Sequence, residues 1–350
     1  MSNEMNKALQ EELQNISFSE IAGKNTSKDD VTTDLSLYDG RNTKLGYADI
    51  SWTSSNPEII SPSGFVMCAE TEKKVTLTAE FTYQDYPDIK GVLTFDITVK
   101  PSEKARTSEY IDTNKIRIFI AGDSTACNYP HEGDNNRYPQ TGWGQVFGEL
   151  FNDEVIVVNC ARSGRSSKSF LREENYQFIS DNIQKGDYLF IQFAHNDCKA
   201  EDLNRYTSPD DGSYQECIYK FINTAKNAGA MPVLCTSITR NILTDTTLVP
   251  YGNALKNIGE QENIPVLDLY KVTHEALEKQ GTEKYAELHM HIVPHDTHFS
   301  DNPEFLRSQY YETGSKDNTH LNINGARVVA SFAADELRRI NHPLAKYLKD

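Results

Sequence analysis

The run IRIFIAGDST, residues 116–125, decides the fold of most of this chain. It is almost continuously apolar as far as a glycine, and a polar Asp-Ser-Thr turn follows at once. A run that is apolar along both faces is typical of a parallel strand covered by helices on both sides. Further runs of this kind follow along the chain at 154–161, 187–194, 231–237 and 264–270.

Segments with helical spacing separate these runs. Residues 322–340 show the clearest 3.6-residue period of apolar side chains. Parallel strands joined by helical crossovers predict a doubly wound, flavodoxin-like α/β sheet over residues 115–350. In such sheets the functional groups gather at the carboxyl ends of the strands, so the polar residues after each run become candidate site residues.

The chain before residue 104 follows a different pattern. Short runs rich in Val, Thr, Ile, Phe and Tyr, such as 73–84 and 91–100, alternate with turn-forming residues. This pattern predicts a small β-sandwich over residues 1–104, with a short helical lead-in at its start. Residues 105–114 are polar and lack an apolar period, so we expect them to form a linker.

Composition limits the partners. The chain carries 35 basic and 51 acidic side chains, for a formal net charge of −16, which disfavours nucleic acid as a partner. No apolar run approaches the roughly 20 residues that cross a bilayer, so no membrane association is predicted. Six cysteines without ligand-like spacing and a polar start favour a cytoplasmic protein, or a secreted one whose leader was removed. Whether the chain forms a homodimer stays open.

Four polar features lie where this fold predicts a site. Ser124 follows the first strand, Gly164 follows the second and Asn196 the third, while Asp317 and His320 precede the last helix. Each has a plainer interpretation: a polar turn, a loop glycine, a capping asparagine, or a helix-start turn or half of a metal site. Their common position at successive strand ends favours a shared catalytic role.

The residue types suit nucleophilic chemistry. A separation of three residues lets the Asp317 carboxylate bind one imidazole nitrogen of His320 while the other faces outward, as a serine base requires. Asn196 can donate its amide to a developing oxyanion, and Gly164 leaves its backbone N–H unobstructed. This chemistry requires no metal and no organic cofactor.

Four sequence blocks together resemble the SGNH (GDSL-type) hydrolases over roughly residues 115–345. The blocks are GDST at 122–125, NxAxSGRSSxSF from Asn159, HND at 195–197 and DxTHLNxxGA from Asp317. GWGQ at 142–145 and the GRSS loop are most similar to the rhamnogalacturonan acetylesterase group. Separately, residues 20–100 resemble atrophied bacterial immunoglobulin-like modules.

The first resemblance implies specific roles. Ser124 is the expected nucleophile, His320 the base, and Asp317 the residue that orients it. The backbone N–H groups of Ser124 and Gly164 and the Asn196 amide form the expected oxyanion hole.

Further candidates concern the substrate: Trp143, Arg165, Lys168 and His195. We hypothesise that Arg165 or Lys168 pairs with a uronate carboxylate and that Trp143 packs near the cleft. A solvated cation and a core tryptophan are the alternatives. The histidine-rich segment 289–298 has spacings that would suit zinc, but we expect it to line the cleft or to form a solvated loop.

The leading interpretation is a serine carbohydrate O-acetylesterase acting on plant cell-wall polysaccharides, with acetylated rhamnogalacturonan favoured over xylan. The alternatives are an acetylxylan esterase, a short-chain aryl or lipid ester hydrolase, and a non-catalytic glycan-binding protein. The sequence contains no apolar lid segment, which speaks against long acyl chains.

Overall fold

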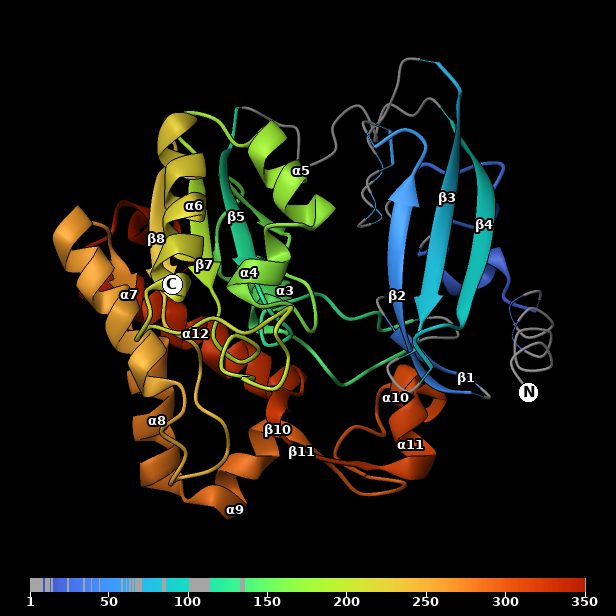
Figure 1. Cartoon of the computed structure of the whole chain (residues 1–350). Coiled ribbons are helices and arrows are strands. Elements are labelled where there is room, and N and C mark those ends of the chain that lie inside the picture. Colours follow the sequence, from blue (N-terminus) through green and yellow to red (C-terminus); the bar gives the residue numbers. More distant parts are fainter. Residues whose placement is uncertain are drawn as a thin grey trace. The chain divides into compact units, whose positions relative to one another are not determined.

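A computed structural model describes residues 114–132 and 136–349. Of the first hundred residues it describes 9, 13, 15–23, 25–33, 35–38, 40–43, 45–57, 59, 60, 62, 64, 66, 71–83 and 86–100. The chain divides into two compact units (Figure 1): Met1–Asp112 with Pro130–Asn136, and Thr113–Tyr129 with Arg137–Asp350. The predicted linker lies outside the described residues apart from Asn114, and so does most of the predicted helical lead-in.

The larger unit is built on a parallel sheet with the strand order β6-β5-β7-β8-β9. The strands are β5 (Ile116–Gly122), β6 (Val155–Asn159), β7 (Tyr188–Gln192), β8 (Met231–Cys235) and β9 (Val266–Leu267). In chain order this is 2-1-3-4-5, the flavodoxin-like arrangement, and the predicted fold class is confirmed. Every residue of β7 is buried, which explains why its sequence is almost continuously apolar.

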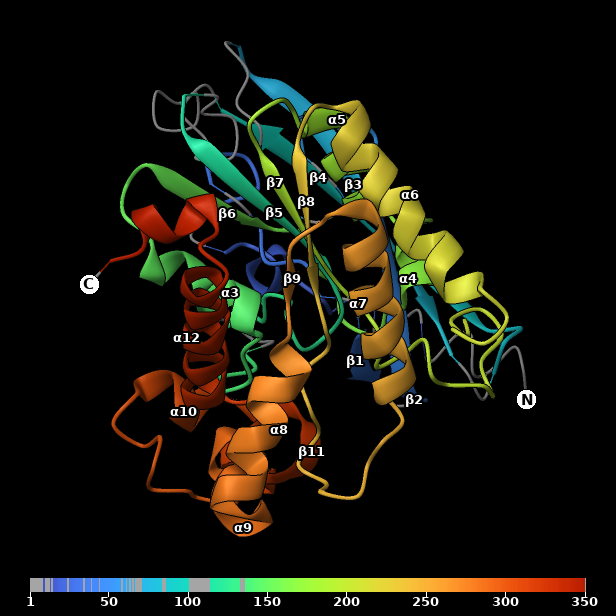
Figure 2. The same ribbon diagram turned by 90° about the vertical axis from the view of Figure 1, so that its left-hand side faces the viewer.

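Helices cover both faces of this sheet (Figure 2). The α-helices of this unit are α3 (Trp143–Phe147), α4 (Ser167–Phe170), α5 (Glu174–Asn182), α6 (Ser213–Asn227), α7 (Val249–Glu262), α8 (Leu269–Gln280), α9 (Thr282–Tyr285), α10 (Pro303–Arg307), α11 (Gln309–Thr313) and α12 (Ile323–Arg339). Short 3₁₀ turns are η2 (Gly148–Leu150), η3 (Ala286–Leu288) and η4 (Pro343–Tyr347). Helices α3 and α12 lie on one side of the sheet, and α6 and α7 lie on the other.

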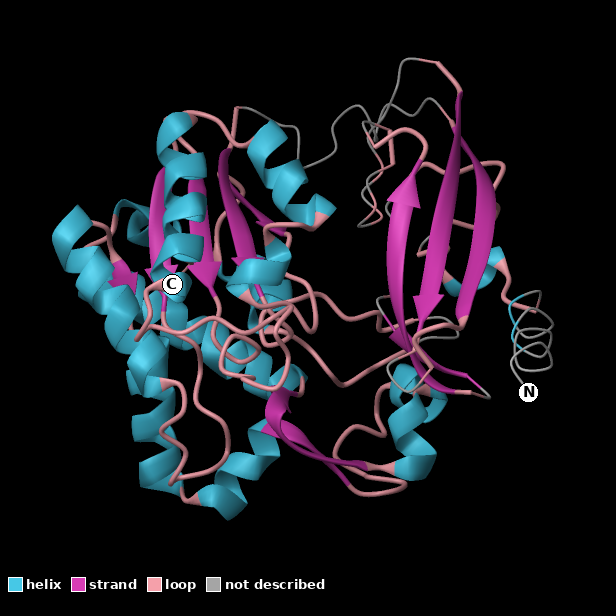
Figure 3. Ribbon diagram, in the orientation of Figure 1, coloured by secondary structure: helices cyan, strands magenta, loops and turns pink. Residues whose placement is uncertain are grey.

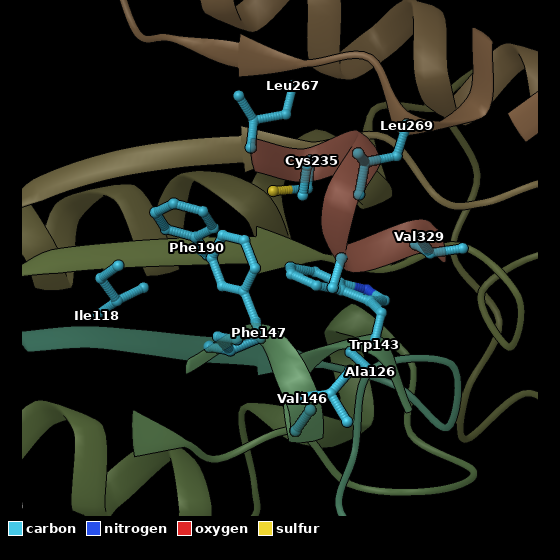
Figure 4. Packing of buried hydrophobic residues seen from close by; sticks show 14 of the residues in the cluster. Ile118, Ala126, Trp143, Val146, Phe147, Phe190, Cys235, Leu267, Leu269 and Val329 are labelled. Carbon is cyan, nitrogen blue, oxygen red and sulfur yellow. The ribbon is translucent and has the colours of Figure 1, made fainter. Parts of the chain in front are cut away.

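The hydrophobic core under α3 and α12 supports strand β5, which leads into the site. Trp143 and Phe147 of α3 and Val329 of α12 pack against Ile118 and Phe190 of the strands (Figure 4). These apolar contacts hold β5 rigidly, because protein interiors are close-packed. The residue that follows β5 is therefore presented from a fixed support.

A β-hairpin precedes α12 and carries the acid and base candidates. Strand β10 (His289–Ile292) pairs antiparallel with β11 (Ser315–Leu321). The register shifts because His289 pairs with Leu321 while Met290 already pairs with Asp317. Residues 318–320 consequently bulge out of the ladder, and His320 lies on an irregular strand.

The N-terminal unit contains a four-stranded antiparallel sheet with the order β1-β2-β3-β4 (Figure 3). Its elements are η1 (Phe18–Glu20), β1 (Gly40–Thr43), β2 (Gly46–Ser54), β3 (Lys73–Thr82) and β4 (Lys90–Val99). Burial alternates along β3, as one covered face requires. Trp52 lies in the core of this unit, donates its indole N–H to the Tyr38 carbonyl at 2.7 Å, and stacks on Phe95.

Candidate active site

Ser124 lies in a tight turn directly after β5. The backbone N–H groups of Ala126 and Cys127 both donate to the Asp123 carbonyl at 3.1 Å. The Tyr129 hydroxyl donates to the Ser124 carbonyl at 2.8 Å. A rigid turn at the carboxyl edge of a parallel sheet therefore holds the Ser124 hydroxyl in one place.

The three residues of the predicted triad come together. His320 Nε2 lies 2.9 Å from Ser124 Oγ, and His320 Nδ1 lies 2.6 Å from Asp317 Oδ2. The Asp317 Oδ1 atom accepts the backbone N–H groups of Thr319 at 2.7 Å and His320 at 3.0 Å. A carboxylate held in this way fixes the imidazole tautomer that leaves Nε2 free to take a proton from serine.

Electrostatics keeps Asp317 ionised. Burial opposes the charged form, but the hydrogen bond and charge of His320 and the two backbone N–H groups outweigh it. The pKa of Asp317 therefore lies well below its usual range. At near-neutral pH the carboxylate is therefore negatively charged and can stabilise an imidazolium on His320.

The two oxyanion-hole candidates lie next to each other. The Asn196 side-chain amide donates to the Arg165 carbonyl at 3.0 Å, beside Gly164 in the loop after β6. Gly164 has a φ of +74°, which favours glycine, and a Cβ there would meet only Arg205 Nη1, at 4.0 Å. The space that a side chain would occupy at Gly164 is therefore open.

Asp197 makes buried hydrogen bonds next to the loops that carry Gly164 and Asn196. It is fully buried and accepts hydrogen bonds from the Ser167 hydroxyl and backbone N–H and from the Thr207 hydroxyl. Burial raises the pKa of Asp197 to about 7, against the lowering effect of these hydrogen bonds. Its contacts join the loops that carry Gly164 and Asn196, so it belongs to the support of the site.

Two of the substrate candidates are buried. Trp143 is fully buried in the core and donates its indole N–H to Gln192, which agrees with the alternative of a core tryptophan. His195 is 3% exposed. Burial and then the positive charge of Arg240 keep the pKa of His195 well below its usual range, so it stays neutral. Neither side chain is exposed to a bound polysaccharide.

The two predicted cations have partners within the protein. Arg165 Nε binds Glu173 at 2.9 Å and its Nη1 donates to the Ser163 carbonyl at 3.0 Å. Lys168 Nζ donates to the Leu203 carbonyl at 2.7 Å. Both side chains therefore hold loops together, and their contact with a uronate stays a prediction.

The histidine-rich segment does not converge on one point. His289 is buried with Nδ1 3.2 Å from the Tyr285 carbonyl, and His291 Nε2 lies 2.7 Å from Asn318 Oδ1. His295 faces Glu312, and His298 binds Asp296 while remaining exposed. Within the described residues, no three His, Cys, Asp or Glu side chains are grouped as metal ligands.

Sequence reasoning missed two cations at this edge of the sheet: Arg205 and Arg240. Arg205 Nη1 lies 3.4 Å from both the Gly164 carbonyl and Asn196 Oδ1. Arg240 follows β8 and binds Asp245 at 2.6 Å. Both residues follow predicted strands, and this position could have marked them as candidates. They lie in loops without a periodic pattern, however, and such loops do not indicate where a long side chain points.

The fold and the site define a hydrolase of the serine type. Residues 120–328, more than half of the chain, match the GDSL-like lipase/acylhydrolase family, and the chain belongs to that family. Residues 10–102 match the atrophied bacterial Ig domain. Both resemblances seen in the sequence are confirmed, and the chain is an esterase, as predicted.

Relatives of this chain come from Bacillus subtilis. Rhamnogalacturonan acetylesterase RhgT is 36% identical over 239 residues, which is 67% of this chain and 94% of that protein. Probable rhamnogalacturonan acetylesterase YesY is 31% identical over 65% of this chain and 95% of its own length. The crystal structure of the YxiM protein has a TM-score of 0.52 at 19% identity, covering 84% of this chain and 75% of that one. The last likeness supports the fold.

Proposed function

We propose that the protein removes O-acetyl groups from plant cell-wall polysaccharides, with acetylated rhamnogalacturonan as the favoured substrate. The observation that carries the chemistry is the 2.9 Å contact between Ser124 Oγ and His320 Nε2, with Asp317 behind it. The preference for a carbohydrate ester is supported by the two relatives named as rhamnogalacturonan acetylesterases.

The first half of the reaction forms an acetyl-enzyme. His320 Nε2 takes the hydroxyl proton as Ser124 Oγ bonds to the acetyl carbon, and the carbonyl oxygen becomes an oxyanion. The Ser124 and Gly164 N–H groups and the Asn196 amide donate to that oxyanion. The intermediate then collapses, the bond from carbon to the sugar oxygen breaks, and the sugar leaves with the proton from His320.

The second half regenerates the enzyme. A water molecule gives a proton to His320 and bonds to the acetyl carbon, which forms a second oxyanion in the same pocket. Release of acetate returns the proton to Ser124. Asp317 stabilises the imidazolium in both halves, because its own low pKa keeps it negatively charged.

The test measures acetate released from acetylated rhamnogalacturonan and from acetylated xylan oligosaccharides. We expect faster release from rhamnogalacturonan, and a loss of at least about 10³-fold in Ser124→Ala on both substrates. Faster release from xylan would favour the acetylxylan alternative. Acetate release that survives in Ser124→Ala would contradict the mechanism.

A second assay separates the short-chain alternatives. Rates on p-nitrophenyl acetate and p-nitrophenyl octanoate are compared in the wild type. An enzyme built for acetyl groups strongly prefers the acetate. An equal or faster rate on octanoate would favour the lipid-ester alternative.

A further inference from the structure

The loop that carries Gly164 is tied down on both sides of the glycine. The Arg162 backbone N–H donates to the Gly122 carbonyl at 3.0 Å, which fixes the loop against the last residue of β5. The Arg165 carbonyl accepts the Asn196 side-chain amide at 3.0 Å, which fixes the loop against the turn after β7. Gly164 is therefore held between two residues that are bound to neighbouring strand ends.

The glycine itself contributes little to its own position. It has no side chain to pack, its φ is +74°, and a Cβ built there would meet only Arg205 Nη1, at 4.0 Å. The direction of its backbone N–H therefore depends on the residues on either side. An oxyanion donor has to stay within about 0.5 Å of its working position, because a displacement of about 1 Å can cost about 10²-fold in rate.

Glu173 connects the two arginines that flank the glycine. Its Oε2 atom accepts from Arg162 Nη1 and its Oε1 atom accepts from Arg165 Nε, each at 2.9 Å. One carboxylate therefore bridges two like charges that would otherwise repel each other. The three side chains are between 11% and 20% exposed, so water and salt screen these ion pairs less than they screen pairs on the surface.

Glu173 is itself held by the start of helix α5. It immediately precedes the helix, and its carbonyl accepts the backbone N–H groups of Tyr176 at 3.1 Å and Gln177 at 3.3 Å. In the first turn of the same helix, the buried Asn175 side chain donates its amide to the Cys160 carbonyl at 2.8 Å, just before the glycine loop. The start of α5 and the loop are thus joined by a neutral hydrogen bond as well as by the two ion pairs.

We propose that Glu173 is a positioning residue of the esterase, which binds Arg162 and Arg165 and so holds Gly164 with its backbone N–H facing the oxyanion. Glu173 acts through the two arginines rather than on the substrate. The proposal rests on the proposed function, because it takes the Gly164 N–H as an oxyanion donor. It gives Arg165 a role in the reaction that does not depend on which polysaccharide is bound.

The test uses p-nitrophenyl acetate, whose small size confines it to the acyl site. The variants of the whole chain are Glu173→Gln, which removes the charge, Glu173→Asp, which keeps it, Arg165→Gln, and the double variant Glu173→Gln/Arg165→Gln. Glu262→Gln is the matched control, since Glu262 forms an ion pair with Lys226 at 2.7 Å and ends α7 just before β9, at the edge of the sheet opposite the site. Turnover is expressed per mole of folded enzyme, which is measured by circular dichroism.

We expect Glu173→Gln to lower kcat by about 10- to 100-fold and to leave KM within about twofold of the wild type. Both half-reactions pass through an oxyanion, so acylation and deacylation slow together and KM is kept. Phenylboronic acid, which forms a tetrahedral adduct on the Ser124 hydroxyl, should bind more weakly by a similar factor. Glu173→Asp should keep more of kcat than Glu173→Gln, and Glu262→Gln should keep kcat within about twofold of the wild type.

The double variant tests whether Glu173 acts through Arg165. Arg165→Gln alone should also lower kcat, because it removes one side of the bridge. The loss in the double variant should then be smaller than the product of the two single losses, as expected for side chains that share one function.

Three results would overturn the proposal. The first is a kcat of Glu173→Gln within about twofold of the wild type. The second is a pair of losses that multiply in the double variant, and the third is a fall in kcat without weaker binding of phenylboronic acid, which would show a role in structure alone. Failure of the proposed function is seen separately, as ester hydrolysis that survives in Ser124→Ala.

Discussion

At the scale of single residues, Asp317 decides whether His320 can work as a base. Asp317→Asn keeps the shape of the side chain but removes the charge and reverses the hydrogen bond to Nδ1. We expect kcat for p-nitrophenyl acetate to fall by about 10³- to 10⁴-fold, because the imidazole then adopts the wrong tautomer and its charged form loses its partner. A decrease below tenfold would show that another group orients His320.

Asn196 contributes at the transition state. Replacing it by alanine or by aspartate removes the amide donor, and kcat should fall by about 10²- to 10³-fold with little change in KM. The aspartate variant also places a negative charge beside the oxyanion, so its kcat should fall further than that of the alanine variant. A change confined to KM would place Asn196 in ground-state binding.

The site residues that could be predicted from the sequence are those that directly follow a strand. Ser124 and Asn196 follow buried strands, and the chain topology brings such positions to one edge without further information. Trp143 kept two interpretations because its indole packs inward from the first turn of α3, which sequence spacing does not reveal.

At the scale of elements, one buried ion pair ties two strands together at the edge opposite the site. Arg117 of β5 donates from Nε and Nη2 to the two carboxylate oxygens of Asp187, at 3.1 and 2.6 Å, and both side chains are 3% exposed. Asp187→Asn removes the negative charge that faces this buried guanidinium. We expect it to lower the free energy of unfolding by about 3 kcal/mol.

The measurement is urea unfolding followed by the loss of esterase activity, which reports on the larger unit. Activity in the absence of urea should be unchanged, because Asp187 precedes β7 at its amino end. Glu275→Gln serves as the control, since Glu275 forms an exposed pair with Lys271 in the same unit and should not shift the urea midpoint. An unchanged midpoint in Asp187→Asn would mean that the pair contributes nothing to stability.

The apolar runs predicted every strand of the parallel sheet but not its exact extent. The run 264–270 contains only Val266–Leu267 as strand β9, because Asp268 caps α8 by accepting the backbone N–H of Lys271. Capping is a local hydrogen bond that ends a strand and starts a helix at a position hydrophobicity does not mark. The segment 289–298 was expected to line the cleft or to form a solvated loop, but its first residues form strand β10.

At the scale of the whole molecule, buried histidines make stability depend on pH. Burial lowers the pKa values of His289 and His342 to about 4. Between the unfolded value near 6.5 and about 4, the unfolded chain binds protons that the folded chain does not, so stability falls as the pH falls. Asp197, with a pKa near 7, acts in the opposite sense, because the folded state binds its proton more tightly between pH 4 and 7.

His342→Asn isolates one of these contributions. The His342 ring accepts the backbone N–H of Leu344 at the start of η4, and asparagine is a good cap that does not titrate. Lowering the pH from 7 to 5 should cost the variant roughly 2 kcal/mol less free energy of unfolding than it costs the wild type. The reason is that pH 5 lies about 1.5 units below the pKa of an unfolded histidine, so the unfolded wild type gains a proton there that the folded His342 does not take up. The contribution of Asp197 is common to both proteins and cancels. An equal loss in both would mean that His342 titrates normally.

The pairing of Ser124 with His320 joins positions 196 residues apart. Almost the entire α/β unit lies between them, so the catalytic contact has a very high sequence separation and closes only after the intervening chain has condensed. A nascent chain on the ribosome therefore gains hydrolytic competence only once helix α12 has emerged to support β11. During refolding, esterase activity should therefore recover later than the hydrophobic core becomes buried. The enzyme is inactive until β11 and α12 have packed against the sheet.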